Sequence, residues 1–503
     1  MRLAIVVASL VAATPAWGAD LRITHVTVFD GTGAPGRAAE VRVHGDRIIE
    51  VAPQLAAKPG ETVRDGQGLA LAPGFIDMHS HGNRGLLKDL DAATVSRQGV
   101  TTIFVGQDGE SDFPLADYFR SLTATPPAIN VASMIGHATL REQVMGKDLY
   151  RASTPAELAK MKALLAKELE AGAFGLSTGL EYEQGHFATT EEVVELSKVA
   201  AATGAFYISH VRDEAEHTFE AFDEVLKIGR GASIPVEITH IKLGATSLWH
   251  QAATRMPGYI ARARRDHVNL KADVYPYTFW HSTIRVLISD RDYFNAAKVT
   301  RAVEENGGAG AILISRYVPD PKLAGKTLAE FAAAWHVSPA DAYMRVIRET
   351  SAEVDGEALE EVNVSSMSED DVSWFVAQPD IMFCSDGELH GSHPRGAGAF
   401  PRVLGRYVRD LKVLPLALAI HKMTGLAANQ LGLPDRGRIA PGYVADLVLF
   451  DPATVADKST IAQPEAAPVG IPAVMVAGEW VIDAGKVTGR HPGRVLKHSR
   501  PTA

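Results

Sequence analysis

The stretch Leu71–Arg84, LAPGFIDMHSHGNR, decides the fold because it has the pattern of a buried strand that ends in two histidines. Side chains alternate between the two faces of a strand, so His79 and His81 point the same way and Ser80 points away. Two imidazoles at one strand end form half of a metal site. The apolar run before them suits the interior of a barrel. We therefore expect the first strand of a metal-binding barrel here, the alternative being two incidental histidines at a strand end.

The middle of the chain repeats such strands at a spacing of about thirty residues, which is the period of an eight-stranded (β/α)8 barrel of the TIM type. The other seven expected strands are 99–106, 129–137, 173–182, 205–214, 235–244, 269–278 and 380–388. Helix-like runs with apolar residues three and four positions apart separate them. The sequence thus predicts an α/β barrel over residues 71–429. A gap before the last strand predicts an insertion at about 284–375 that could cover the barrel mouth.

The two ends of the chain carry short β-like runs broken by Asp-Gly and Gly-Asp turns. Neither end is long enough to bury a core alone. We expect residues 19–70 and 430–495 to form one small β-sandwich domain, with the barrel inserted between its halves.

Residues 1–18 have the layout of a secretory signal peptide: one basic residue, an apolar run and a small-residue end. The sequence therefore predicts a cleaved signal and a periplasmic or secreted protein. No later stretch holds 18 consecutive apolar residues, so no membrane association is expected after cleavage. A net charge of −10 without long basic runs argues against a nucleic-acid partner. The single cysteine, Cys384, excludes an intramolecular disulfide.

Chemistry-bearing residues collect at the expected carboxyl ends of the barrel strands, where TIM-type barrels place their active sites. They are His79, His81, Glu181, His210, His240 and Asp386. Imidazole and carboxylate ligands suit Zn²⁺ first, while Mn, Fe and Co remain alternatives. For Asp386 the alternative is a turn residue of its Ser-Asp-Gly sequence.

These residues lie in motifs that resemble the amidohydrolase superfamily and, within it, the N-acyl-D-amino-acid deacylases (D-aminoacylases). The motifs are APGFIDMHSH, GLSTGLEY, SHVRDE, THIKLG, DVYPYT, SDG, HPRGAGAFPRVLG and KMTGLAANQLGLPDRGRIAPGYVADLVLFDP. The resemblance implies that the four histidines bind one or two Zn²⁺ ions. It also implies that Asp386 acts as general base towards a metal-activated water and returns the proton to the leaving amine.

The chain departs from this family at one place, where GVTTIFVGQDG has Asp108 instead of a zinc-ligating cysteine. A carboxylate can bind zinc, and Asp-Gly is also common turn chemistry, so we expect Asp108 to be either a ligand or a turn residue. Glu181 stands where superfamily members often place a bridging carboxylate. Our hypothesis is that Glu181 replaces the missing thiolate and bridges two metals.

An N-acyl amino acid carries a carboxylate that its pocket must hold. By resemblance the residues that hold it are Lys242, Tyr275, Ser282 and Arg395, of which Arg395 suits a two-point contact. Lys242 and Arg395 have a plainer alternative as surface charges, and the assignment of Ser282 depends on a segment one residue longer than in the family.

The leading function is thus hydrolysis of a linear amide, with an N-acyl-D-amino acid or a dipeptide as the small-molecule partner. The sequence leaves open whether the protein is a monomer or an oligomer. The alternatives are a cyclic-amide hydrolase of the hydantoinase or dihydroorotase kind, and a non-catalytic periplasmic binding protein. The proposed carboxylate-binding residues argue against the former, and a general base argues against the latter.

Overall fold

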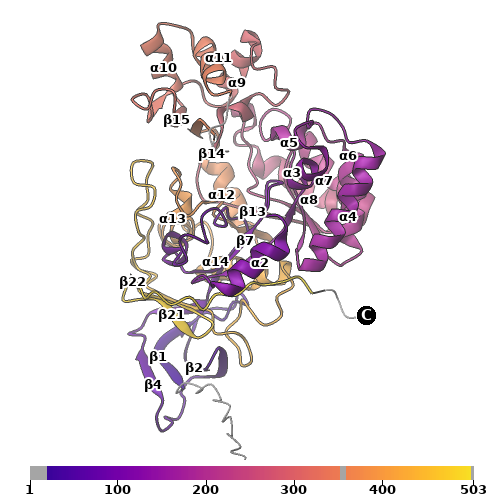
Figure 1. Ribbon diagram of the computed structural model, residues 1–503. Helices are drawn as coiled ribbons and strands as arrows, with labels where there is room; N and C mark the ends of the chain where they lie inside the picture. Colours follow the sequence, from indigo (N-terminus) through magenta and orange to yellow (C-terminus); the bar gives the residue numbers. More distant parts are fainter. Residues whose placement is uncertain (1–19, 352–357, 500–503) are drawn as a thin grey trace, which may run out of the picture.

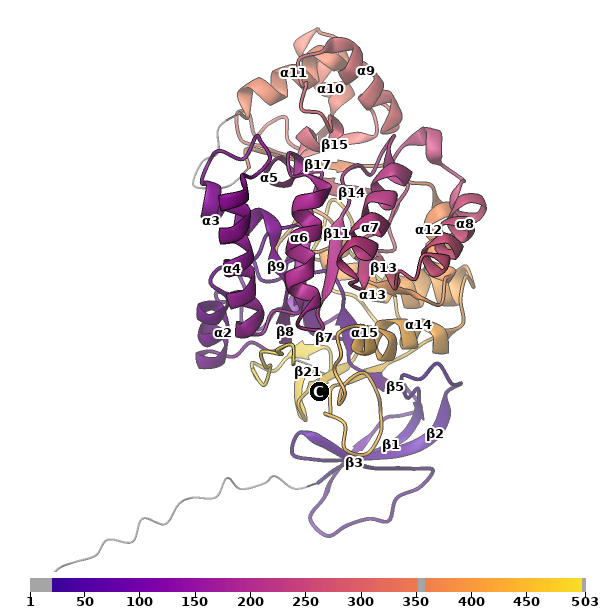
Figure 2. The same ribbon diagram turned by 90° about the vertical axis from the view of Figure 1, so that its right-hand side faces the viewer.

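The computed structural model describes residues 20–351 and 358–499, so the expected signal peptide lies outside the described residues. Three parts follow one another in Figures 1 and 2: a lobe of helices and a small sheet, a central barrel, and a sheet built from the two ends of the chain. The lobe and the terminal sheet lie at opposite ends of the barrel.

The barrel is built of parallel strands that fall within all eight stretches expected from the sequence, so the predicted (β/α)8 fold is confirmed. The strands are β6 (Phe75–Asp77), β7 (Val100–Val105), β8 (Asn130–Ser133), β9 (Ile135–Gly136), β10 (Gly175–Gly179), β11 (Phe206–His210), β12 (Val236–Ile238), β13 (Leu270–Val274) and β18 (Ile381–Phe383). They form two ladders, β6-β7-β8 and β9-β10-β11-β12-β13-β18, rather than one continuous sheet. Backbone hydrogen bonds outside these ladders link the end of β6 to the end of β18, such as the one from Met78 N to the Phe383 carbonyl (3.3 Å).

Helices alternate with the barrel strands, and their apolar sides join the strands in one large core. They are α1 (Ala93–Ser96), α2 (Leu115–Ala124), α3 (His137–Met145), α4 (Pro155–Ala171), α5 (Glu183–His186), α6 (Thr190–Ala201), α7 (Thr218–Ala232), α8 (Ala252–Arg265), α12 (Glu369–Ala377), α13 (Arg395–Arg402), α14 (Leu416–Met423) and α15 (Gly425–Gln430). The capping box of α4, in which Thr154 and Glu157 exchange hydrogen bonds, shows how local sequence starts such a helix. Within the described ranges, no helix combines the length and apolarity that crossing a bilayer requires.

The lobe lies between β13 and β18 and has its own hydrophobic cluster. It consists of β14 (Trp280–Ser282), α9 (Ala296–Glu305), β15 (Ile312–Tyr317), β16 (Lys326–Thr327), α10 (Leu328–Trp335), α11 (Pro339–Glu349) and β17 (Glu360–Val364). The separate cluster runs from Ile284 to Val364. Helix α12, which falls inside the expected insertion, packs instead on the barrel, where Val372 and Phe375 join the main core.

The terminal sheet unites both ends of the chain in one nine-stranded sheet. Its members are β1 (Leu21–Val28), β2 (Arg37–His44), β3 (Arg47–Ala52), β4 (Thr62–Asp65), β5 (Ala70–Pro73), β19 (Leu447–Phe450), β20 (Ala473–Val476), β21 (Glu479–Asp483) and β22 (Lys486–Val487). Strand β1 pairs with β4 through its first half and with β5 through its second half, on either side of an irregularity at His25, whose φ is 50°.

Gly74 joins this sheet to the barrel, because it alone separates β5 from β6. A Cβ atom at this position would lie 2.2 Å from Oγ1 of Thr101 on the neighbouring strand β7. The close approach explains why the motif that leads to the two histidines contains a glycine.

Candidate metal centre

The two histidines of the first strand meet residues from two other strand ends at the mouth of the barrel. His79 and His81 follow β6, and their Nε2 atoms lie 3.2 Å apart. Asp108 follows β7 and Asp386 follows β18, both with left-handed backbone (φ 59° and 51°) that turns the chain directly after the strand. The Asp386 N–H donates to the His79 carbonyl (2.8 Å), so a hydrogen bond between the ends of the first and last barrel strands also brings this carboxylate to the histidines.

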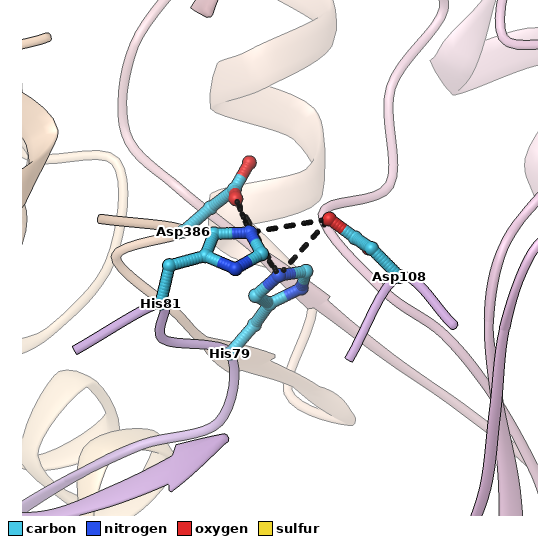
Figure 3. A group of neighbouring side chains, drawn as sticks. All are labelled: His79, His81, Asp108 and Asp386. Atoms are coloured by element: carbon cyan, nitrogen blue, oxygen red, sulfur yellow. Dashed lines mark hydrogen bonds and ion pairs between the residues drawn. The ribbon is translucent and has the colours of Figure 1, made fainter. Parts of the chain in front are cut away.

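These four side chains form a first subsite, shown in Figure 3. Each histidine Nε2 lies 3.2–3.4 Å from Oδ2 of Asp108 and from Oδ1 of Asp386. In a tetrahedral zinc site with metal–nitrogen bonds of about 2.0–2.1 Å, neighbouring ligand atoms are about 3.3–3.4 Å apart. The five distances from the histidine nitrogens match those of a tetrahedral ligand set, so the residues fit a zinc ion.

A second subsite shares Asp108 with the first. Nδ1 of His210, at the end of β11, lies 3.0 Å from Nε2 of His240, which follows β12. Oδ1 of Asp108 lies 3.3 Å from His240 Nε2 and 3.8 Å from His210 Nδ1. The two oxygens of one carboxylate thus face the two histidine pairs.

Glu181, which we expected to bridge two metals, does not lie between the two histidine pairs. The carboxylate that lies between them belongs to Asp108. Glu181 places its Oε2 2.9 Å from Nε2 of His210, the ring nitrogen that faces away from Asp108. It forms a separate group with His210 and Glu214. From the sequence we expected Asp108 to be either a metal ligand or a turn residue. In the structure it has the left-handed backbone of a turn, and its carboxylate also lies in the histidine cluster.

The charges around the cluster favour an ionised Asp386. Burial by itself raises the pKa of this carboxyl, but the guanidinium of Arg395 and the imidazole of His79 hold the pKa well below its ordinary value. Burial also opposes ionisation of Asp108, and there the imidazoles of His79 and His240 lower the pKa. Both carboxylates are therefore charged at neutral pH, as metal binding and proton uptake require.

The residues expected to hold a substrate carboxylate lie beside the cluster, with one exception. Nζ of Lys242 is 2.5 Å from Glu214, and Arg395 is 2.6 Å from Oδ2 of Asp386. The Tyr275 ring lies near both cations, 5.7 Å from Lys242 Nζ and 5.0 Å from the Arg395 guanidinium. Ser282 lies in the lobe sheet, paired with Val362. The carbonyl of its neighbour His281 is 3.5 Å from Arg395.

Sequence reasoning missed two groups at this site. The Tyr182 hydroxyl lies 3.3 Å from Nδ1 of His210, on the side that faces Asp108. Glu214 lies 3.1 Å from Nδ1 of His240 and forms the ion pair with Lys242. Tyr182 directly follows Glu181 in the motif GLSTGLEY, and Glu214 comes four residues after His210 in SHVRDE. Their position just beyond a predicted strand end was the signal that could have identified them.

Comparison with known proteins gives the same picture over nearly the whole chain. The model of the amidohydrolase family matches residues 62–361 and 371–482. A D-aminoacylase of Alcaligenes xylosoxydans xylosoxydans is 38% identical, covering 95% of this chain and 97% of the relative. A crystal structure of D-aminoacylase, described as having a binuclear metal centre with one-metal activation and second-metal attenuation, superposes with a TM-score of 0.82 at 36% identity, covering 95% and 99% of the two chains. N-acyl-D-glutamate deacylase from Bordetella bronchiseptica, solved with zinc and a phosphonate mimic of the tetrahedral intermediate, gives 0.84 at 35% identity, covering 96% and 100%.

Proposed function

Because this chain belongs to the amidohydrolase family, we propose that it is a zinc-dependent hydrolase of N-acyl-D-amino acids. The observation that carries the proposal is the joined pair of histidine subsites beside a buried carboxylate, Asp386, whose second oxygen is paired with Arg395. The relatives that support it act on linear N-acyl amino acids, and the similarity covers their whole length.

Bound zinc would polarise the amide carbonyl and make water a better nucleophile. Asp386 then accepts the proton of the attacking water at Oδ1, since Oδ2 is engaged by Arg395. The water oxygen bonds to the carbonyl carbon, the carbon–nitrogen bond breaks, and Asp386 gives its proton to the departing amine. The Tyr182 hydroxyl, beside His210, donates a hydrogen bond towards the carbonyl oxygen.

The free carboxylate of the substrate binds to the cations of Lys242 and Arg395, both of which lie beside the Tyr275 ring. These two cations favour a linear N-acyl amino acid or a dipeptide over a simple hydantoin, whose ring carries no free carboxylate. Arg395 contributes its remaining N–H groups, because one terminal nitrogen is paired with Asp386.

A substrate panel with added zinc tests this function. It compares N-acetyl-D and N-acetyl-L amino acids, D,L and L,D dipeptides, and hydantoins, with Asp386→Asn in parallel. We expect turnover of the N-acetyl-D series that the substitution abolishes. Turnover of dipeptides alone would move the substrate to peptide fragments, and turnover of hydantoins alone would contradict the proposal.

We also propose that the protein is exported to the periplasm, on the strength of residues 1–18. Fractionation of expressing cells with amino-terminal sequencing of the product tests this. Cleavage after Gly18 and release by osmotic shock are expected, whereas an intact Met1 in the cytoplasmic fraction would contradict export.

A further inference from the structure

Glu181 is a buried acid that the proposed reaction does not use. Its exposed fraction is 5%, and across the described ranges its ion-pair partner is the His210 imidazole, with no lysine or arginine paired to it. Its other oxygen, Oε1, accepts a hydrogen bond from the backbone N–H of Glu214 (3.3 Å). Burying a carboxylate without a cationic partner is costly, so the position calls for an interaction that offsets the cost.

The contact with His210 has a defined direction. His210 turns Nδ1 towards Asp108 and His240, and it turns Nε2 towards Glu181 at 2.9 Å. With the proton on Nε2 donated to Glu181, the lone pair of Nδ1 faces the second subsite. A carboxylate that accepts from the outer nitrogen of a metal-binding histidine orients the ring and increases its basicity.

We propose that Glu181 is a positioning residue, which holds His210 in the tautomer and orientation that bind the metal ion of the second subsite. It acts through His210 and is not itself a ligand. Glu214 lies 3.1 Å from Nδ1 of His240, but it also pairs with Lys242, whose Nζ is 3.0 Å from the same Nδ1 atom. Glu181 is therefore the cleaner residue to test.

This inference rests on the zinc site of the proposed function, and its test uses metal binding without any substrate. Zinc affinities of the wild type, Glu181→Leu and Glu181→Gln are measured by competition with a chromophoric chelator. The control is Glu183→Gln, because Glu183 is two residues away and bonds only to the hydroxyls of Tyr150 (3.0 Å) and Tyr293 (2.8 Å) in the described structure. The visible spectrum of each Co²⁺-loaded protein reports the ligand set.

Glu181→Leu should lower the affinity for one of the two zinc ions by about 10–100-fold and leave the affinity for the other unchanged. Its Co²⁺ spectrum should be that of the wild type. Glu181→Gln should lose less zinc affinity, because its amide oxygen still accepts a hydrogen bond from Nε2 of His210. The control Glu183→Gln should bind zinc as the wild type does. Equal loss in both variants with an altered Co²⁺ spectrum would make Glu181 a ligand. Unchanged zinc affinity in Glu181→Leu would also overturn the inference, whereas a wild type that binds no zinc would overturn the proposed function itself.

Discussion

The two histidine pairs share one aspartate but differ in how complete their ligand sets are. The first subsite brings together two imidazole nitrogens and two carboxylate oxygens, whereas the second brings two nitrogens and one oxygen. Zinc sites with four protein ligands are structural, and sites with three leave room for water or substrate. With its three ligand atoms, the second subsite has the composition of a catalytic zinc site in the proposed reaction. In the first subsite, Oδ1 of Asp386 can either hold an ion or accept a proton, but it cannot do both at once.

Removing the shared carboxylate should have the largest effect. Asp108→Ala takes one ligand atom from each subsite, so we expect both zinc ions to be lost and kcat/KM to fall by about 10³-fold or more at limiting zinc. Metal analysis after gel filtration, together with steady-state kinetics, measures both. Asp108→Cys is the control, since a thiolate restores a zinc ligand and should recover at least one ion. Retention of both ions by Asp108→Ala would show that the subsites do not depend on Asp108.

Asp386→Asn should separate the two subsites. We expect kcat to fall by about 10²–10⁴-fold, because the amide cannot accept the proton of water. The second subsite should keep its zinc, since Asp386 belongs to the first. If one equivalent of zinc remains and kcat is unchanged, another group is the base.

The strands and the gathering of the ligands could be predicted from the sequence, because parallel strands of a closed barrel end at one face. His79, His81, His210, His240 and Asp386 each end or follow a predicted strand and do meet in the structure. Which carboxylate lies between the pairs could not be predicted. It depends on the left-handed turn at Asp108. The Asp-Gly sequence indicates a turn there, but it does not say where the turn directs the carboxylate.

The limits of the lobe and the place of Ser282 also needed the structure. The missing βα period predicted an insertion but not where it ends. The apolar side of α12 would suit packing on either the lobe or the barrel, and the structure shows that it packs on the barrel. The partners of Ser282 come from β17, about eighty residues further along the chain, and local sequence does not encode such a pairing.

Arg395→Met should give a smaller effect, in two measurable parts. The KM for N-acyl amino acids should rise about 10–100-fold, as expected for a lost charged hydrogen bond. The Asp386 pKa should also rise, because Arg395 is the largest of the influences that lower it. Protonation then removes the base at a higher pH, so the acid limb of the kcat/KM profile should move upwards. An unchanged KM and an unchanged acid limb would leave Arg395 without either role.

Thr239→Val should give the smallest effect, confined to the first subsite. Oγ1 of Thr239 lies 2.6 Å from Nδ1 of His79 and donates to Asp273 (3.2 Å), so a hydroxyl orients His79 as Glu181 orients His210. A neutral partner contributes less to ligand basicity than a carboxylate, and we expect about a tenfold loss of zinc affinity in the first subsite, at the lower end of the range for such partners. Thr239→Ser keeps the hydroxyl and should bind zinc as the wild type does. If Thr239→Val and Glu181→Leu weaken the same ion, the two histidine pairs form one site rather than two, and the comparison between them fails.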